Sequence, residues 1–310
     1  MVDEALYDIL VIGAGPAGYT AGLYGARAGR RTLMLDSGIG GGQLATTFRI
    51  ENYPGVAGEV SGFELAETMK KQALHFGAEL VQDEALELTV EEDYFQVRAR
   101  NKTYLGKTVI LATGASPRKL DVEGEERLAG KGVSYCATCD GAFFRDKKVA
   151  VVGGGNSAVE EALFLAKFAR EVYIIHRRDQ LRADKVVQEE AVNNPKISFL
   201  FNYVVDEIVG EGKVTGVKLK STVGKGERFV DLDGVFIYIG NIPNTSLVRG
   251  LVELDERGFV ITDEELCTSQ KGLYAAGDVR QKFLRQVVTA CADGATAATS
   301  AALYLSKRGA

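Results

Sequence analysis

Short apolar runs followed by glycine turns mark two places where a buried strand is expected to lead into a helix. Residues 9–12 and 149–152 are continuously apolar, as parallel strands covered on both faces are. A glycine-rich turn, an alanine- and leucine-rich segment and a second apolar run follow, the last at 32–35 and 172–175. The pattern predicts strand, turn, helix and strand at both places, as in an α/β protein.

The two segments follow one plan at one length, which indicates an internal repeat. Their first glycines, at 13 and 153, and the ends of their second strands, at 36 and 176, are both 140 positions apart. The turns read Gly13-Ala-Gly15-Pro16-Ala17-Gly18 and Gly153-Gly-Gly155-Asn156-Ser157-Ala158.

Such a turn suits a dinucleotide because its small residues have distinct tasks. One glycine permits the bend, one lets the backbone approach a pyrophosphate, and a third small residue lets helix and strand pack closely. The free N–H groups at the start of the helix then attract the phosphates. A single turn of this kind also occurs in ordinary α/β cores, but two copies in the same context favour two nucleotide sites.

The residue at the end of each second strand predicts which nucleotide each unit binds. Asp36 would accept hydrogen bonds from ribose hydroxyls, which suits FAD or NAD and repels a 2′-phosphate. The equivalent His176 is followed by Arg177, Arg178 and Arg182. Cations there suit the 2′-phosphate of NADPH, although a solvated basic strand end would read the same in isolation.

The domain organisation follows from the length and from a late return to the first unit. The 310 residues exceed what one core usually serves, so two domains are expected. Residues 273–279 read as a short strand that ends in a glycine turn with an acid, Gly277-Asp278. We expect a discontinuous FAD domain, 1–117 and 246–310, with an NADPH domain, 118–245, inserted into it.

Composition and charge narrow the class of protein without naming a function. The chain is 46% hydrophobic and has 36 glycines against 5 prolines, which suits many tight strand-to-helix turns. Its net charge of −5 indicates neither a nucleic-acid partner nor a membrane surface. No apolar stretch reaches membrane-spanning length and Met1 leads into a strand, so a cytoplasmic location is expected.

A close cysteine pair, Cys136-Ala-Thr-Cys139, precedes the second unit and is followed by Asp140. This spacing allows a disulfide within one helical turn and lowers the pKa of one thiol, as thiol exchange requires. Asp140 is an acid able to move the accompanying proton. Zinc is the competing interpretation, but Cys267 and Cys291 form no second pair and no histidine is near, so we expect no metal.

Taken together, these residues resemble the low-molecular-weight, bacterial-type NADPH-dependent thioredoxin reductases along the whole chain. The motifs that carry the resemblance, beyond the two glycine turns, are Gly41-Gly42-Gln43-Leu44, Glu51-Asn52-Tyr-Pro-Gly55, Cys136-Ala-Thr-Cys-Asp-Gly141, His176-Arg-Arg-Asp-Gln-Leu-Arg182, Gly277-Asp-Val279 and Arg285-Gln286.

The resemblance implies a homodimer in which NADPH reduces FAD, FAD reduces the cysteine pair, and the pair reduces thioredoxin. It makes Cys139 the sulfur beside the flavin, Cys136 the one that attacks thioredoxin, and Asp140 the general acid. Positions that hold FAD in such enzymes correspond, besides the first glycine turn, to Gly42, Gln43, Leu44, Thr46, Asn52, Ala85, Thr113, Gly277, Asp278, Arg285, Gln286 and Val287. One departure is Ala142, where many relatives have an aromatic residue, while Phe143 and Phe144 remain.

Other functions stay open at this point: a reductase for another disulfide acceptor, one fed by ferredoxin, or a zinc-stabilised nucleotide sensor without catalysis. The three arginines argue against ferredoxin, since without NADPH they would have no phosphate to bind. We also expect the inserted domain to rotate during turnover. The nicotinamide site and the cysteine pair belong to that domain, and both must reach the flavin of the other.

Overall fold

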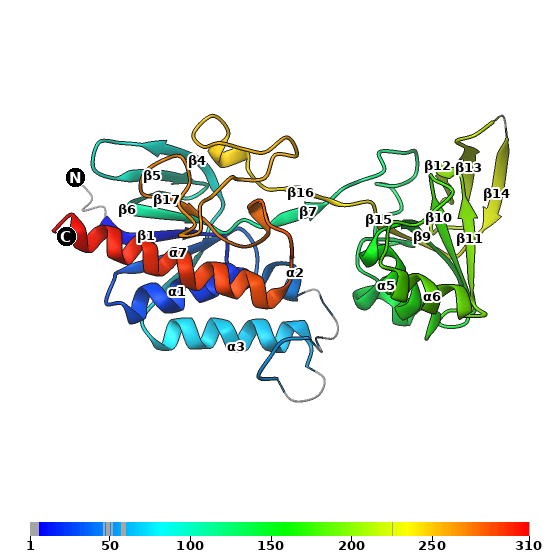
Figure 1. The fold of residues 1–310 in the computed structure, drawn as a ribbon, viewed down its shortest axis with the longest axis horizontal. Coiled ribbons are helices and arrows are strands. Elements are labelled where there is room, and N and C mark those ends of the chain that lie inside the picture. The colour runs from blue at the N-terminus through cyan, green and yellow to red at the C-terminus, as the bar shows by residue number, and fades with distance from the viewer. Residues whose placement is uncertain are drawn as a thin grey trace. The chain divides into compact units, whose positions relative to one another are not determined.

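The computed structural model describes residues 6–45, 47, 50, 52–56, 60–224 and 226–309, with Thr138 and Cys139 described by their backbone alone. The chain divides into two compact units, Met1–Ser116 with Ile242–Ala310, and Pro117–Asn241 (Figure 1). The sequence placed the crossings after residues 117 and 245, and in the structure they fall after 116 and 241.

A seven-stranded sheet forms the centre of the first unit, with strand order β3-β2-β1-β6-β5-β4 and β17 paired to β6. The strands are β1 (Leu6–Ile12), β2 (Thr32–Asp36), β3 (Glu79–Gln82), β4 (Ala85–Val90), β5 (Phe95–Ala99), β6 (Thr103–Leu111) and β17 (Leu273–Ala275). The strands β3, β2, β1, β6 and β17 pair in parallel, whereas β5 pairs antiparallel with both β6 and β4. Because β17 comes from the end of the chain, both parts of the unit share one sheet.

Helices cover one face of this sheet and a second core covers the other, which explains why its strands are apolar on both sides. They are α1 (Pro16–Arg27), α2 (Gly42–Ala45), α3 (Gly62–His75) and α7 (Val287–Lys307). Ile9 and Val11 face this helical layer, and Leu10 and Ile12 face a second core under the loops on the other side. In Figure 1, α1 lies between α7 and α3, and it packs against both.

The second unit repeats this plan with a five-stranded parallel sheet of order β11-β10-β9-β15-β8. Its strands are β8 (Val133–Ser134), β9 (Lys148–Gly153), β10 (Glu171–His176), β11 (Ile197–Phe201) and β15 (Gly234–Tyr238). The order matches β3-β2-β1-β6-β17 of the first unit position by position. The expected α/β architecture with two Rossmann-like units is thus confirmed.

The two faces of the second sheet have different covers. On one lie the helices α4 (Ala137–Asp140), α5 (Asn156–Ala166) and α6 (Lys185–Asn193), with the 3₁₀ turn η1 (Gly141–Phe144). On the other lies an antiparallel sheet of β12 (Tyr203–Val209), β13 (Gly216–Ser221) and β14 (Glu227–Asp231), which shares a core with the parallel strands.

The chain passes between the units along two short strands, β7 (Ala115–Pro117) and β16 (Asn241–Pro243), which pair with each other. The 3₁₀ turns η2 (Ser246–Val248) and η3 (Gly277–Val279) belong to the first unit. Thr113 Oγ1 donates to the Asn244 carbonyl at 2.7 Å and Asn244 Nδ2 donates to the Thr113 carbonyl at 2.9 Å. The crossing is therefore fixed where it leaves the first unit.

Candidate functional site

The first turn has three glycines. At Gly13 and Gly18, backbone atoms occupy the space that a side chain would need, whereas at Gly15 this space is open. A Cβ on Gly13 would lie 2.4 Å from the Ala112 carbonyl oxygen, and Gly13 has φ +104°. A Cβ on Gly18 would lie 1.9 Å from the Gly13 carbonyl oxygen. At Gly15 the nearest atom would be 3.9 Å away, on Gly42. The turn is thus open where a phosphate would approach, and the Gly41-Gly42 loop lies beside that opening.

Helix α1 begins without a side-chain cap. Pro16 is its first residue and Gly15 its N-cap, and no side chain among the described residues caps its first turn. Uncapped N–H groups above an open backbone fit a pyrophosphate.

Asp36 lies at the end of β2 and is half-buried. Its carboxylate accepts hydrogen bonds from the N–H groups of Ala14, at 2.7 Å, and Gly38, at 2.9 Å. Each carboxylate oxygen keeps a further lone pair, so Asp36 is held in place and can still accept from a ribose hydroxyl. The Asp83 N–H donates to the Asp36 carbonyl at 2.9 Å, which brings the strand that starts at Ala85 to the same sheet end.

Several other expected FAD residues are held in place by contacts within the first unit. Gln43 Nε2 donates to the Ala115 carbonyl at 2.5 Å, while Leu44 is buried. Asn52 Nδ2 donates to Gln286 Oε1 at 3.0 Å, and Gln286 is the N-cap of α7, which starts at Val287. Thr46, also expected here, lies outside the described residues.

Asp278 and Arg285 are half-buried residues, and each has one buried polar atom that lacks a partner. Asp278 Oδ1 and Arg285 Nε are inaccessible to solvent and form no hydrogen bond with the described residues. Burial raises the pKa of Asp278, while Lys282 and Arg285 act in the opposite direction. Orphaned buried atoms are rare in folded proteins, so their presence fits a bound hydroxyl-rich ligand such as the ribitol of FAD.

Asp293 on α7, a half-buried acid that the sequence motifs did not indicate, holds this loop in place. It accepts from the Gly277 N–H at 3.0 Å and from Lys282 Nζ at 2.7 Å, and it forms an ion pair with Arg280 at 3.4 Å. An acid inside an otherwise small and apolar helix was the available signal.

The second glycine turn has the same open middle position. A Cβ on Gly153 would lie 2.4 Å from the Tyr238 carbonyl oxygen, whereas a Cβ on Gly155 would meet nothing within 4 Å. Helix α5 also starts without a side-chain cap. Its first residue, Asn156, exchanges hydrogen bonds of 2.7 Å with Asp184, and Ser157 is exposed.

At the end of β10 the charges differ from the expectation in one respect. His176 is buried, packs against Gly154 and has its pKa lowered by burial and by the three arginines, so its ring is neutral at pH 7. The cations at this strand end are therefore Arg177, Arg178 and Arg182 alone. All three are exposed, and their guanidinium groups form no ion pair or hydrogen bond with any described residue.

The cysteine motif lies at the carboxyl end of β8, in the second unit. Cys136 is disulfide-bonded, whereas Cys267 and Cys291 are free. The Cys136 N–H donates to Ser134 Oγ at 3.0 Å, and Ser134 Oγ donates to the Cys136 carbonyl at 3.2 Å. The side chain of Cys139 lies outside the description, so the expected pairing and the role of Cys139 stay predictions.

The residues on either side of Cys136 are also fixed. The Asp140 N–H donates to the Cys136 carbonyl at 3.2 Å, which closes the single turn of α4. Tyr135 Oη donates to the buried Glu125, which also accepts from the backbone N–H groups of Leu120 and Asp121. The motif therefore sits on a rigid frame, of which the sequence reading had identified only the cysteines and Asp140.

The two phenylalanines after the motif have different environments. Phe144 is buried and packs edge-on against Phe236, with 5.2 Å between ring centroids. Phe143 is 77% exposed, beside the exposed Ala142. Phe144 is thus a core residue, and Phe143 is free for a partner.

Comparison with known proteins gives a consistent result. The family model of the pyridine nucleotide-disulphide oxidoreductases matches residues 7–294. The chain is 48% identical over 308 residues to a thioredoxin reductase of Peptoclostridium acidaminophilum, covering 97% of this chain and 98% of that one. It is 48% identical over 304 residues to a thioredoxin reductase of Listeria monocytogenes, covering 98% and 95%. The structure resembles a Lactococcus lactis thioredoxin reductase in the FR conformation, with a TM-score of 0.90, 42% identity, and 97% and 99% of the two chains covered.

Proposed function

Because the chain belongs to the thioredoxin reductases, within the pyridine nucleotide-disulphide oxidoreductase family, we propose that it passes electrons from NADPH through FAD to a Cys136–Cys139 disulfide and then to thioredoxin. The observation that carries this assignment is the coexistence of two open glycine turns and a disulfide-bonded Cys136 in one chain. FAD, when bound, supplies a two-electron carrier between the nucleotide and the disulfide.

The first unit supplies the residues that would hold FAD. The N–H groups at the start of α1 face the pyrophosphate, Asp36 accepts from the adenosine ribose, and Asp278 and Arg285 use their unpartnered atoms on the remaining hydroxyls and carbonyls. Gln43, Asn52 and Gln286 orient the rest. This set is proposed from the matching motifs and from the orphaned atoms Asp278 Oδ1 and Arg285 Nε.

The second unit supplies the NADPH residues. Gly155 and the first turn of α5 would receive the pyrophosphate, and Arg177, Arg178 and Arg182 would bind the 2′-phosphate through charge-assisted hydrogen bonds. His176 lies at the end of the same strand, and its neutral ring adds no charge to the site.

The cysteine pair is proposed to reduce thioredoxin in two thiol-exchange steps. The Cys136 thiolate attacks one sulfur of oxidised thioredoxin, and the other thioredoxin sulfur leaves and takes a proton from Asp140. The Cys139 thiolate then attacks Cys136, which re-forms the Cys136–Cys139 disulfide and releases thioredoxin, whose second sulfur takes its proton from water. Phe143, exposed beside the motif, is proposed to contact the partner.

Turnover is proposed to include rotation of the second unit. The nicotinamide site and the cysteine pair lie in one unit, joined to the FAD unit by only two short strands, β7 and β16. Short crossings at element ends are suited to a hinge. A disulfide engineered between the units should leave FAD content unchanged and abolish NADPH-driven thioredoxin reduction. Normal turnover of the cross-linked enzyme would rule rotation out.

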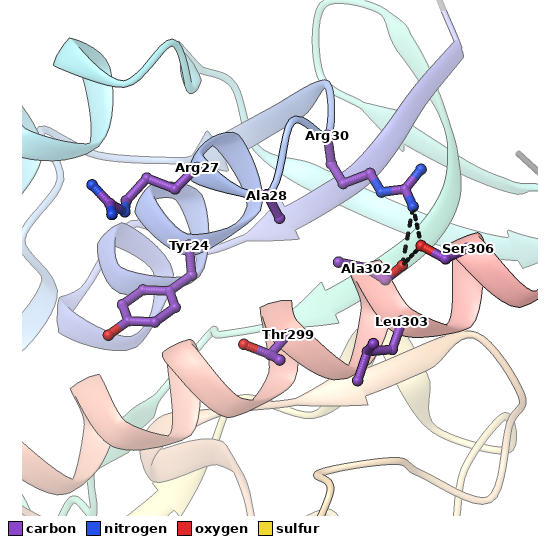
Figure 2. A pocket seen from close by; sticks show the side chains of 8 residues that line it. All are labelled: Tyr24, Arg27, Ala28, Arg30, Thr299, Ala302, Leu303 and Ser306. Atoms are coloured by element: carbon purple, nitrogen blue, oxygen red, sulfur yellow. Dashed lines mark hydrogen bonds between the residues drawn. The ribbon is translucent and has the colours of Figure 1, made fainter.

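The protein is also proposed to form a homodimer through the outer faces of α1 and α7. Figure 2 shows a groove between these helices, lined by Tyr24, Arg27, Ala28, Arg30, Thr299, Ala302, Leu303 and Ser306. Leu303 and Tyr24 are both exposed there, at 58% and 45%, so the groove presents two large apolar side chains to a partner. Leu303→Glu should shift the sedimenting species from dimer to monomer, whereas Phe229→Glu, at an equally exposed site on β14, should not.

In the described ranges, no helix is both long and apolar enough to cross a bilayer. The free thiols of Cys267 and Cys291 favour a reducing compartment, so the cytoplasm is proposed.

The direct test of the function is a stoichiometric assay. With catalytic amounts of the purified protein, one NADPH should be oxidised for each thioredoxin disulfide reduced, and NADH should replace it poorly. NADPH oxidation that produces no thioredoxin thiols would contradict the proposal.

A further inference from the structure

One side chain connects the second glycine turn to the cysteine motif. Tyr238 is the last residue of β15, and its backbone pairs with Gly153 in the parallel register of β9. Its side chain reaches α4, where the Ala137 N–H donates to the Tyr238 hydroxyl oxygen at 2.6 Å. The residue that flanks the nucleotide turn therefore also holds the helix of the redox pair.

The Ala137 N–H depends on this contact. Ala137 is fully buried, so its N–H cannot turn to water. The neighbouring N–H groups are satisfied separately, that of Cys136 by Ser134 and that of Asp140 by the Cys136 carbonyl. Without the Tyr238 hydroxyl, a buried donor in the first turn of α4 would lose its acceptor, and a helix of one turn has few other contacts to hold it.

A half-buried acid on a neighbouring helix acts on the same hydroxyl. Glu161 is on α5, which packs against both α4 and β15, and its Oε2 is inaccessible and has no partner among the described residues. Burial, with a smaller effect of Glu160, raises the pKa of Glu161 to about 7. Burial, then Glu161 and, to a lesser extent, Asp140 raise the pKa of Tyr238. No ionisable group of β9, β10, β11 or α6 adds to either shift.

Resting on the proposed function, we infer that Tyr238 is a positioning residue of the redox site, which fixes the first turn of α4, and that Glu161 on α5 modulates this contact. The two side chains form no hydrogen bond with each other, so Glu161 acts through space: when it is ionised, its charge favours the orientation of the Tyr238 hydroxyl in which the oxygen accepts from the Ala137 N–H. When Glu161 is protonated, that orientation is lost. The contact therefore strengthens as the pH rises through about 7.

Tyr238→Phe tests the positioning role, because it removes the acceptor and keeps the ring. We expect thioredoxin turnover to fall about tenfold at pH 7.5, with the KM for NADPH unchanged. Iodoacetamide alkylation of Cys136 in the NADPH-reduced holoenzyme, followed by mass spectrometry of its peptide, should become about threefold slower at pH 7. The slower reaction is expected because the first turn of α4, which directly follows Cys136, is then less well ordered. Tyr173→Phe, which removes a hydroxyl that donates to Glu171 on β10, is the matched control and should change neither quantity.

Glu161→Gln tests the control by the acid and provides a second variant if Tyr238→Phe folds poorly. The wild-type alkylation rate of Cys136 should show an inflection near pH 7 beyond the thiol's own, and Glu161→Gln should remove it while Glu190→Gln on α6 keeps it. Wild-type alkylation and turnover in Tyr238→Phe, or an unchanged pH profile in Glu161→Gln, would overturn the inference. Alkylation needs no thioredoxin, so failure of the wild-type protein to reduce thioredoxin would contradict the proposed function without deciding this inference.

Discussion

The two glycine turns share the parts that packing requires and differ in the parts that face a ligand. Gly13 and Gly153 are both crowded by backbone, Gly15 and Gly155 are both open, and both helices start uncapped. The second strands end differently, in a half-buried carboxylate on the first unit and in a neutral ring followed by three unpaired arginines on the second. Comparison of the two units therefore distinguishes the residues that packing requires from the residues that select the nucleotide.

The largest expected effect separates the chemistry of the two units. Cys139→Ser and Cys136→Ser, both in the second unit, should each reduce thioredoxin turnover to background, because either change removes the disulfide. FAD content, a property of the first unit, should stay at the wild-type level. NADPH should still bleach the flavin of both variants in anaerobic stopped-flow measurements. Wild-type thioredoxin reduction by either single variant would show that the pair has been assigned wrongly.

The next effect concerns the third small residue of each turn. Gly18→Ala would place a methyl group 1.9 Å from the Gly13 carbonyl oxygen, so α1 must shift and the purified protein should lose most of its FAD. The second unit already has Ala158 at this position. Ala158→Gly should keep NADPH binding and cost about 1 kcal/mol of helix stability. Flavin absorbance per mole of protein measures the first effect, and a full complement of FAD in Gly18→Ala would contradict it.

A smaller effect tests the nucleotide preference at the end of β10. Replacing Arg177 and Arg178 with alanine should raise the KM for NADPH about a hundredfold and leave that for NADH nearly unchanged, since two charge-assisted contacts to the 2′-phosphate are lost. Arg170→Ala, just before the opposite end of the same strand, is the control. Steady-state kinetics with both nucleotides decide the matter. Equal use of NADH and NADPH by the unaltered protein would refute the assignment.

The smallest effect concerns the residue that replaces Asp36 in the second unit. The folded state lowers the pKa of His176 below its unfolded value of about 6.5, so the neutral ring favours folding. That contribution is complete above pH 6.5 and is lost as the pH falls through and below this value. His176→Asn should therefore narrow the Tm difference between pH 7.5 and 5.5 by a few degrees at most. An equal Tm difference between the two pH values in the wild-type and the variant protein would contradict this.

The sequence predicted those parts of the fold that depend on local pattern. The apolar runs 9–12 and 149–152 lie within β1 and β9, and the strand ends at Asp36 and His176 are those of β2 and β10. Strand bounds extend beyond the apolar runs, as at Leu6, because the hydrogen-bond ladder with β6 continues where side chains become exposed. The antiparallel layer β12–β14 has no glycine turn of the repeated kind and was not predicted.

The contacts that fix the site could not be read from the sequence, because they join residues far apart in the chain. Tyr238 contacts Ala137 across 101 positions, and Asn52 contacts Gln286 across 234. His176 was expected among the cations, and only its burial reveals a neutral ring. Sequence gave the chemistry of single residues, whereas their protonation and partners required the fold.

Anaerobic titration of the holoenzyme tests the central claim, that electrons pass from NADPH through FAD and the cysteine pair to thioredoxin. Stepwise addition of NADPH should bleach the flavin absorption after the disulfide has taken the first two electrons. Oxidised thioredoxin added next should restore the oxidised flavin spectrum, and two thioredoxin thiols should appear for each electron pair returned. A flavin that stays reduced in the presence of excess oxidised thioredoxin would contradict the account.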